Sequence, residues 1–420
     1  MSDSGARKSN IGNLIKNNIR NYSMFIMLAV IMVIFAFLTR GTNFNSRNFT
    51  NIFIQYSYVL ILAVGMVQVI IIGGIDLSVG SVCAFVGAIS VMVYNTGIGI
   101  IPTLLVALII GAAIGAFQGV WIAYLQIPAF IVTLAGMLLF RGLTYIITKV
   151  NPINPHDDVY KQMASGFLNF PGFEIHYGGP IEGFRFGALP EELAGNFSIG
   201  TVYLSALLIG VIVIVLYIVT EVLSRKNRLK NNFEVTPIPL FVGKVALISA
   251  LVIFLSQRFS TYRGLPIVVI VLGITIFIFN FIMKNTVLGR YIYAVGGNAR
   301  SAKLSGINSE QVVFIVFSIM GLLSGLAAVV STGYMNSALP QAGNLFEMDA
   351  IAACYIGGVS ASGGIGTVVG VIVGGLVMSA INNGMSLMNL GQHWQYVVKA
   401  AVVILAVLYD VYTRRKTGLG

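Results

Sequence analysis

The segment Ile72-Gly73-Gly74-Ile75-Asp76-Leu77-Ser78-Val79-Gly80 places an acid and two adjacent glycines between long apolar runs. A helix needs about 20 apolar residues to cross a bilayer, and roughly ten to twelve apolar runs fill this chain. Hydrophobic residues make up 57% of the sequence and charged residues only 9%, which excludes an ordinary soluble domain. The sequence predicts an all-α polytopic membrane protein, with broken or re-entrant segments, that transports a solute.

The charges predict the orientation of the chain. The formal net charge is +11, and the basic residues cluster at the N-terminus and within residues 225–230, 284–303 and 414–416. Six acids lie instead between residues 149 and 200. Basic segments stay in the cytoplasm, so both termini are expected inside a bacterial cytoplasmic (inner) membrane and the acidic connection outside it. The basic balance therefore concerns topology and does not indicate a nucleic-acid partner.

These runs predict one transmembrane domain over residues 24–411, between a cytoplasmic N-terminal segment, 1–23, and a cytoplasmic tail, 412–420. An external connection is expected over 149–200, a cytoplasmic turn over 224–235 and a longer cytoplasmic segment over 284–311. The candidate spans are 24–39, 56–72, 77–94, 101–123, 129–148, 201–220, 240–257, 265–283, 312–331, 366–383 and 395–411. Eleven crossings would separate the termini, so either the short piece 350–356 also crosses or one run does not cross fully.

The Gly-Gly pair recurs. Ile72-Gly73-Gly74 and Ile356-Gly357-Gly358 each end or interrupt an apolar run, and small residues that include Ser360 follow the second pair. Many transporters contain two repeats with broken helices at matching positions. Chance recurrence among 47 glycines is the alternative.

Asp76 and Ser78 have two interpretations. The Asp76 carboxylate could accept backbone N–H groups and cap the next helix, or it could contact the transported species. The second acidic site, Glu347 and Asp349, precedes an apolar run. No nucleophile or histidine lies nearby in sequence, so acids that stabilise a helix start are favoured over acid–base chemistry.

The glycine-rich segment Gly357–Gly366 lacks the Lys-Ser/Thr ending of a phosphate-binding loop, so the chain is not expected to hydrolyse ATP itself. Close helix packing or an unwound core segment is the expected role of these glycines. Cys83 and Cys354 lie far apart in apolar runs and indicate buried small side chains. We expect no metal and no cofactor in this chain.

The cytoplasmic segment Leu288–Asn308 is too long to be a simple turn. Residues Ala299–Leu304 are expected to form a short helix stopped by Gly306. An exposed helix with apolar and basic residues favours docking to a partner, whereas a solvated loop that only sets topology is the alternative.

With these residues the chain resembles the permease subunit of bacterial ABC-type monosaccharide importers, the class for ribose, galactose, xylose and multiple monosaccharides. The matching segments are GGIDLSVGS (73–81), GAFQGVWIAYLQIPAFIVTLAGMLLFRGL (115–143), GRYIYAVGGNARSAKLSGI (289–307), PQAGNLFEMDAIAACYIGGVSASGGIGTVVG (340–370) and Asn382-Asn383-Gly384. Together these motifs are highly specific, and their sequence is most similar to the xylose or multiple-monosaccharide branch.

The resemblance implies a fold similar to the cobalamin-importer permease, with two permease copies around a central pathway in the lipid. Two ABC-type ATPase domains would bind ATP below, and an external binding protein would deliver the monosaccharide. The expected pathway or its supporting backbone comprises Gly73, Gly74, Asp76, Ser78, Gly357, Gly358 and Ser360. The expected ATPase-coupling residues are Gly289, Arg290, Gly296, Gly297, Asn298, Ala302, Ser305 and Gly306.

The predicted mechanism is alternating access driven by the partner ATPases, with the permease itself non-catalytic. A proton-coupled secondary sugar transporter using Asp76 is the alternative, and it would transport without a partner. An intramembrane enzyme is disfavoured because the chain has no HExxH, GxSxG or metal-binding acid pair in a span. The sugar, the number of crossings, the role of residues 149–200 and the choice between homodimer and heterodimer stay open.

Overall fold

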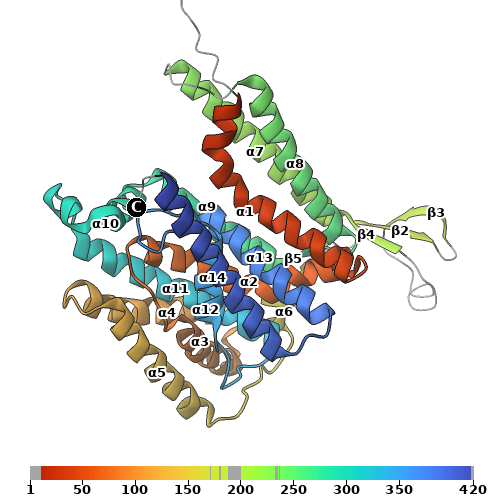
Figure 1. Cartoon of the computed structure of the whole chain (residues 1–420). Coiled ribbons are helices and arrows are strands. Elements are labelled where there is room, and N and C mark those ends of the chain that lie inside the picture. The colour runs from red at the N-terminus through yellow and green to blue at the C-terminus, as the bar shows by residue number, and fades with distance from the viewer. Residues whose placement is uncertain are drawn as a thin grey trace, which may run out of the picture. The chain divides into compact units, whose positions relative to one another are not determined.

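The computed structural model describes residues 11–170, 172–178, 181–187, 200–231, 235 and 237–417. Helices dominate this part of the chain, as the apolar runs predicted (Figure 1). Their bounds are α1 Ile11–Leu38, α2 Ser46–Ile71, α3 Val79–Val93, α4 Ile100–Ala123, α5 Ala129–Thr148, α6 Val159–Ser165, α7 Leu204–Lys230, α8 Ile238–Ser260, α9 Ile267–Asn285, α10 Val287–Leu304, α11 Ser309–Met335, α12 Phe346–Ile356, α13 Val368–Leu387 and α14 Gln392–Thr417.

Nine helices in the described ranges are long and apolar enough to cross a membrane. They are α2, α3 with its π-helical extension to Ile98, α4, α5, α7, α8, α9, α11 and α13. The apolar part of α1, Met24–Leu38, is shorter. The chain is therefore a multi-pass membrane protein of the predicted all-α class, and the total number of crossings stays a prediction.

In the described residues, five short strands interrupt the helices. β1 (Phe167–Leu168) pairs antiparallel with β5 (Leu265–Pro266). β2 (Glu174–Gly178) pairs antiparallel with both β3 (Ile181–Phe186) and β4 (Gly200–Tyr203), so the sheet order is β3-β2-β4. The register places Ile175 opposite Phe186 on one side and Val202 on the other.

The described residues form two compact units. The first contains residues 1–43, 55–163 and 271–420. Within it α4 and α11 lie side by side (Figure 1), and small residues let their backbones touch. A β-carbon added to Gly321 would overlap the carbonyl oxygen of Gly111, and one added to Gly325 would overlap that of Ala107. A second contact buries α1 on α13, where the Phe35 ring lies against Gly384.

The second unit contains residues 44–54 and 164–270. Its centre is the pair of helices α7 and α8, which approach closely where Gly210 faces the Ser256 hydroxyl. The Lys244 ammonium lies 2.6 Å from the Glu221 carboxylate across the same pair. The rings of Phe49, Phe53 and Phe259 pack together at one end of this unit.

The structure adds secondary structure within three segments of the predicted organisation. A connection was expected over 149–200, and the structure places α6, β1, β2, β3 and the first residue of β4 in it. The turn expected over 224–235 is helical through Lys230, because Arg, Lys and Leu are good helix formers. The segment 1–23 is helical from Ile11. Residues 1–10, 188–199 and 418–420 lie outside the described part.

Candidate functional site

The acidic segment between α2 and α3, residues Ile72–Ser78, is called the hook here, and its Asp76 and Ser78 side chains are buried. Asp76 is only 3% exposed, and its Oδ1 accepts hydrogen bonds from the Ser78 amide at 2.8 Å and the Ser78 hydroxyl at 2.7 Å. The Gln118 side-chain amide on α4 donates to the Ser78 oxygen at 3.0 Å. Thr133 on α5 donates to the Ile75 carbonyl at 3.2 Å. The carboxylate thus fixes the path of its own loop, and two neighbouring helices fix the loop in place.

The first turn of α3 crosses the loop that leads into α12. A β-carbon on Gly80 would overlap the carbonyl oxygen of Gly343, and one on Gly343 would overlap that of Gly80. Arg141 on α5 donates from Nη1 to the Ala342 carbonyl at 2.5 Å. Glu347 is 7% exposed and its carboxylate lies against Gly80. The start of α3 therefore meets the loop before α12 here, and Glu347 lies at the crossing.

The two acids of α12 lie in its first turn, as the sequence predicted, but they face different partners. Glu347 faces the crossing, whereas the Asp349 carboxylate is 2.9 Å from the Lys399 ammonium on α14. The Tyr56 hydroxyl on α2 donates to Asp349 Oδ2 at 3.3 Å. The two acids thus serve two separate sites.

The Gly-Gly segments and helix α10 converge in a glycine junction, which we define as the end of α2, residues Tyr293–Gly296 of α10 and the loop Gly357–Gly366. The Gly364 amide donates to the Ile71 carbonyl at 2.9 Å. The same carbonyl lies against Gly296 so closely that a β-carbon there would overlap it. The Tyr293 hydroxyl donates to the Gly366 carbonyl at 2.7 Å. The junction therefore joins three segments that are far apart in the sequence.

Helix α10 consists of two pieces that meet at Asn298, where φ is −161° and ψ is 100°. The Asn298 side chain accepts the Ser301 amide at 2.9 Å and so caps the second piece, residues 299–304. The chain then turns at Gly306, whose φ of +83° belongs to the left-handed region. Leu304 is 85% exposed at the tip, beside the exposed Lys303. Leu304 and Lys303 are therefore accessible to a partner at this tip.

Comparisons with known proteins show the family of this chain. The model of the family "Branched-chain amino acid transport system / permease component" matches residues 48–226 and 183–407. The chain belongs to this permease family. The resemblance inferred from the motifs is thereby confirmed, and the permease is a transport component rather than an enzyme.

Relatives of the permease match along nearly its whole length. The xylose transport system permease protein XylH of Haemophilus influenzae is 33% identical over 400 residues, 95% of this chain and 98% of the relative. XylH of Escherichia coli K12 is 35% identical over 402 residues, 94% of both chains. The ribose import permease protein RbsC of Escherichia coli K12 is 33% identical over 385 residues, 91% of this chain and 92% of the relative. No solved structure matches the chain.

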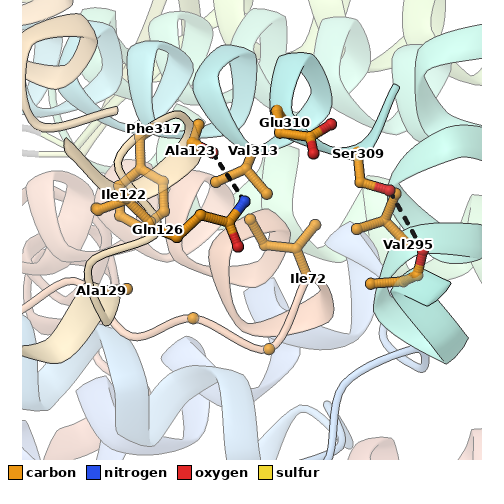
Figure 2. A pocket seen from close by; sticks show the side chains of 13 residues that line it. Ile72, Ile122, Ala123, Gln126, Ala129, Val295, Ser309, Glu310, Val313 and Phe317 are labelled. Atoms are coloured by element: carbon orange, nitrogen blue, oxygen red, sulfur yellow. Dashed lines mark hydrogen bonds between the residues drawn. The ribbon is translucent and has the colours of Figure 1, made fainter. Parts of the chain in front are cut away.

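A cavity of about 250 Å³ lies beside the glycine junction of the permease (Figure 2). Its walls come from the hook, the α4–α5 connection, α10 and α11, and Glu310 lies at the first turn of α11. The Lys303 ammonium is 2.6 Å from the Glu310 carboxylate. The lining residues are Ile72, Gly73, Gly74, Ile122, Ala123, Gln126, Ala129, Val295, Ala299, Ser309, Glu310, Val313 and Phe317.

The residues predicted from the sequence lie at several places in the permease. Asp76 and Ser78 share the hook, and Gly296 contacts the glycine junction. Gly73, Gly357 and Gly358 line cavities on either side, while Ser360 is buried and its amide donates to the Ile365 carbonyl. Gly289 lies against the end of α9, whereas Arg290, Gly297 and Ser305 are exposed.

Sequence reasoning missed Gln118, Arg141 and Lys399. Each is a polar residue in an apolar helix, which is the signal that could have found them, because such a residue in lipid needs a partner. Among the described residues, no group of three or more His, Cys, Asp or Glu side chains could hold a metal ion.

Proposed function

We propose that the permease is the membrane subunit of an ATP-driven importer for a monosaccharide, with a five-carbon sugar as the favoured cargo. The relatives named for xylose and ribose support this cargo, and both are pentoses. In this proposal two copies of the permease enclose the pathway, two ATPase domains bind below them, and an external binding protein delivers the sugar. Both termini lie in the cytoplasm.

The observation that carries the proposal is the contact of Gly296 with the Ile71 carbonyl. The exposed tip of α10, residues 299–304, has the composition of a docking surface, and its base lies directly against the end of α2. A movement of the tip would therefore displace Ile71, and with it the hook that begins at Ile72. ATP-driven motion of a partner would reach the pathway by this short route.

The hook supports alternating access because it is rigid. The Asp76 carboxylate binds Ser78, and Gln118 and Thr133 hold the loop from α4 and α5. A rigid hook transmits displacement from the cytoplasmic end of α2 to the start of α3 and to the Gly80–Gly343 crossing. The cargo needs only contacts that differ between the inward and outward states.

Purification in mild detergent followed by reconstitution tests the function. A stoichiometric P-loop ATPase that purifies with the permease, and sugar uptake that requires ATP and the binding protein, are the expected results. Uptake by the permease alone that collapses with the proton gradient would select the secondary transporter instead.

A pair of substitutions tests the coupling role. Gly306→Pro forces a φ near −65° on a position that adopts +83°, so it should disrupt the docking tip and abolish uptake while the partners still hydrolyse ATP. Gly306→Asn is the matched control, because asparagine tolerates the left-handed region and no atom lies within 4 Å of an added β-carbon. Unchanged uptake in Gly306→Pro would contradict the assignment.

A further inference from the structure

The charge on α14 requires an explanation. From Gln392 to Tyr409 the helix carries Lys399 as its only Lys, Arg, Asp or Glu residue. A lysine in an apolar helix is costly in lipid unless its charge is neutralised, and such residues usually serve a function. An acidic side chain that neutralises the Lys399 charge is therefore expected nearby.

The partner is the Asp349 carboxylate, whose two oxygens lie 2.9 Å and 3.1 Å from the Lys399 ammonium. The Tyr56 hydroxyl adds a hydrogen bond of 3.3 Å from α2. The Lys399 side chain is 20% exposed and the Asp349 side chain 15%, so the pair is largely buried in the protein. Removing one member of such a pair leaves the other charge without compensation.

Helix α12 is the element that the pair holds. Its eleven residues span about 16 Å. The loop before it crosses α3 at Gly80, and the loop after it enters the glycine junction at Gly364. Helix α12 is thus a short rod between the crossing and the junction, and Asp349 lies in its first turn.

We propose that the largely buried Asp349–Lys399 ion pair is a latch that holds the α12 rod in register, so that movement at the glycine junction reaches the crossing. Lys399 and Asp349 are positioning residues for transport in this proposal. The inference rests on the proposed importer function and adds to it the pair on which the transmission of movement depends.

Charge reversal tests the latch in the reconstituted complex of permease, ATPase and binding protein. Lys399→Asp and Asp349→Lys each place two like charges together, and we expect each to lower the sugar transported per ATP by about tenfold. The exchanged pair Asp349→Lys/Lys399→Asp restores opposite charges and should recover most of this ratio. Lys399→Arg keeps the charge and is expected to retain it.

The ratio of sugar to ATP separates a latch from simple destabilisation, because a poorly folded fraction lowers uptake and stimulated hydrolysis together. The matched control is the Glu221–Lys244 pair between α7 and α8, which lies away from the α12 rod in sequence and bonds at 2.6 Å. Lys244→Asp should leave the ratio unchanged.

Three outcomes are decisive. A wild-type complex without ATP-dependent uptake would overturn the importer function and the latch together. A working wild-type complex with a normal ratio in both single reversals would overturn the latch alone. A lowered sugar-to-ATP ratio in the assembled single variants that is not restored in the exchanged pair would also reject the latch. Restoring opposite charges should restore the ratio if the ion pair is what holds α12.

Discussion

Gly296 on α10 lies directly against the carbonyl oxygen of Ile71 at the end of α2, with no space for a side chain between them. This contact joins α10 to the hook that contains Asp76. The neighbouring residue, Gly297, has open space within 4 Å of an added β-carbon. An added methyl group should therefore disrupt the packing at Gly296 and be accommodated at Gly297.

Gly296→Ala should separate α10 from α2 and reduce ATP-dependent uptake at least about tenfold, because backbone atoms at the contact cannot move as a flexible side chain can. Gly297→Ala adds its methyl group in open space and should lower uptake much less than Gly296→Ala does. Uptake assays in proteoliposomes, normalised to assembled complex, give the comparison. Equal uptake in the two variants would show that the contact does not transmit movement.

Asp76→Asn distinguishes the structural role of the hook from proton coupling. The asparagine oxygen can accept the same two hydrogen bonds from Ser78, at 2.8 Å and 2.7 Å in the wild type. We therefore expect uptake to persist in Asp76→Asn and to fall in Asp76→Ala, which removes the acceptor. Uptake is measured with and without a proton gradient. Loss of uptake in Asp76→Asn despite normal folding would favour a titrating carboxylate.

Gly321→Ala tests the crossing of α4 and α11. The added β-carbon would overlap the Gly111 carbonyl, so the helices must separate, at a cost of about 1–3 kcal/mol. Gly273→Ala on α9 is the control, because nothing lies within 4 Å of its added β-carbon. Thermal unfolding in detergent should show a lower apparent melting temperature for the first variant only. Identical melting temperatures would contradict the close packing.

Asp157 predicts a pH dependence at the connection between α5 and α6. The Tyr94 hydroxyl donates to its carboxylate at 2.6 Å and the Val159 amide at 2.9 Å, and these bonds lower the pKa of Asp157 below its ordinary 3.8. A carboxyl group with a lowered folded-state pKa stabilises the fold above its ordinary pKa, and this contribution disappears as the pH falls through the folded-state value.

Below about pH 4 the apparent melting temperature of the wild type should therefore decline more steeply than that of Asp157→Asn, which keeps both acceptor bonds without the charge. Asp158→Asn, at the next position, is the control. Parallel pH profiles for wild type and Asp157→Asn would show that the carboxylate makes no such contribution.

The helices could be predicted because hydrophobic length is a local property of the chain. The span expected over 129–148 is helix α5, Ala129–Thr148, and most other boundaries agree to within a few residues. The strands β1 to β4 were missed because this stretch, rich in glycine and aromatic residues, shows no clear alternation of apolar and polar residues. The last turns of α7, up to Lys230, were not predicted, since a turn was expected over 224–235 and the charges there did not prevent the helix from continuing.

The partners of the site residues could not be predicted in the same way. The capping bond between Asp76 and Ser78 is local, so the sequence alone indicated it. The roles of Gln118, Arg141 and Lys399 depend on groups 40 or more residues away, and a single sequence holds no signal for such pairs.

The sequence by itself determined that this protein crosses the membrane repeatedly, that its helices break at glycines, and which family it belongs to. The first two properties follow from the cost of placing backbone and charge in lipid, which acts on each segment separately, and the family follows from the motifs. Only the tertiary structure decided that Ile71, Gly296 and Gly364 meet at one junction and that Lys399 pairs with Asp349. Such contacts depend on how whole helices pack, because close approach and charge compensation involve both partners at once.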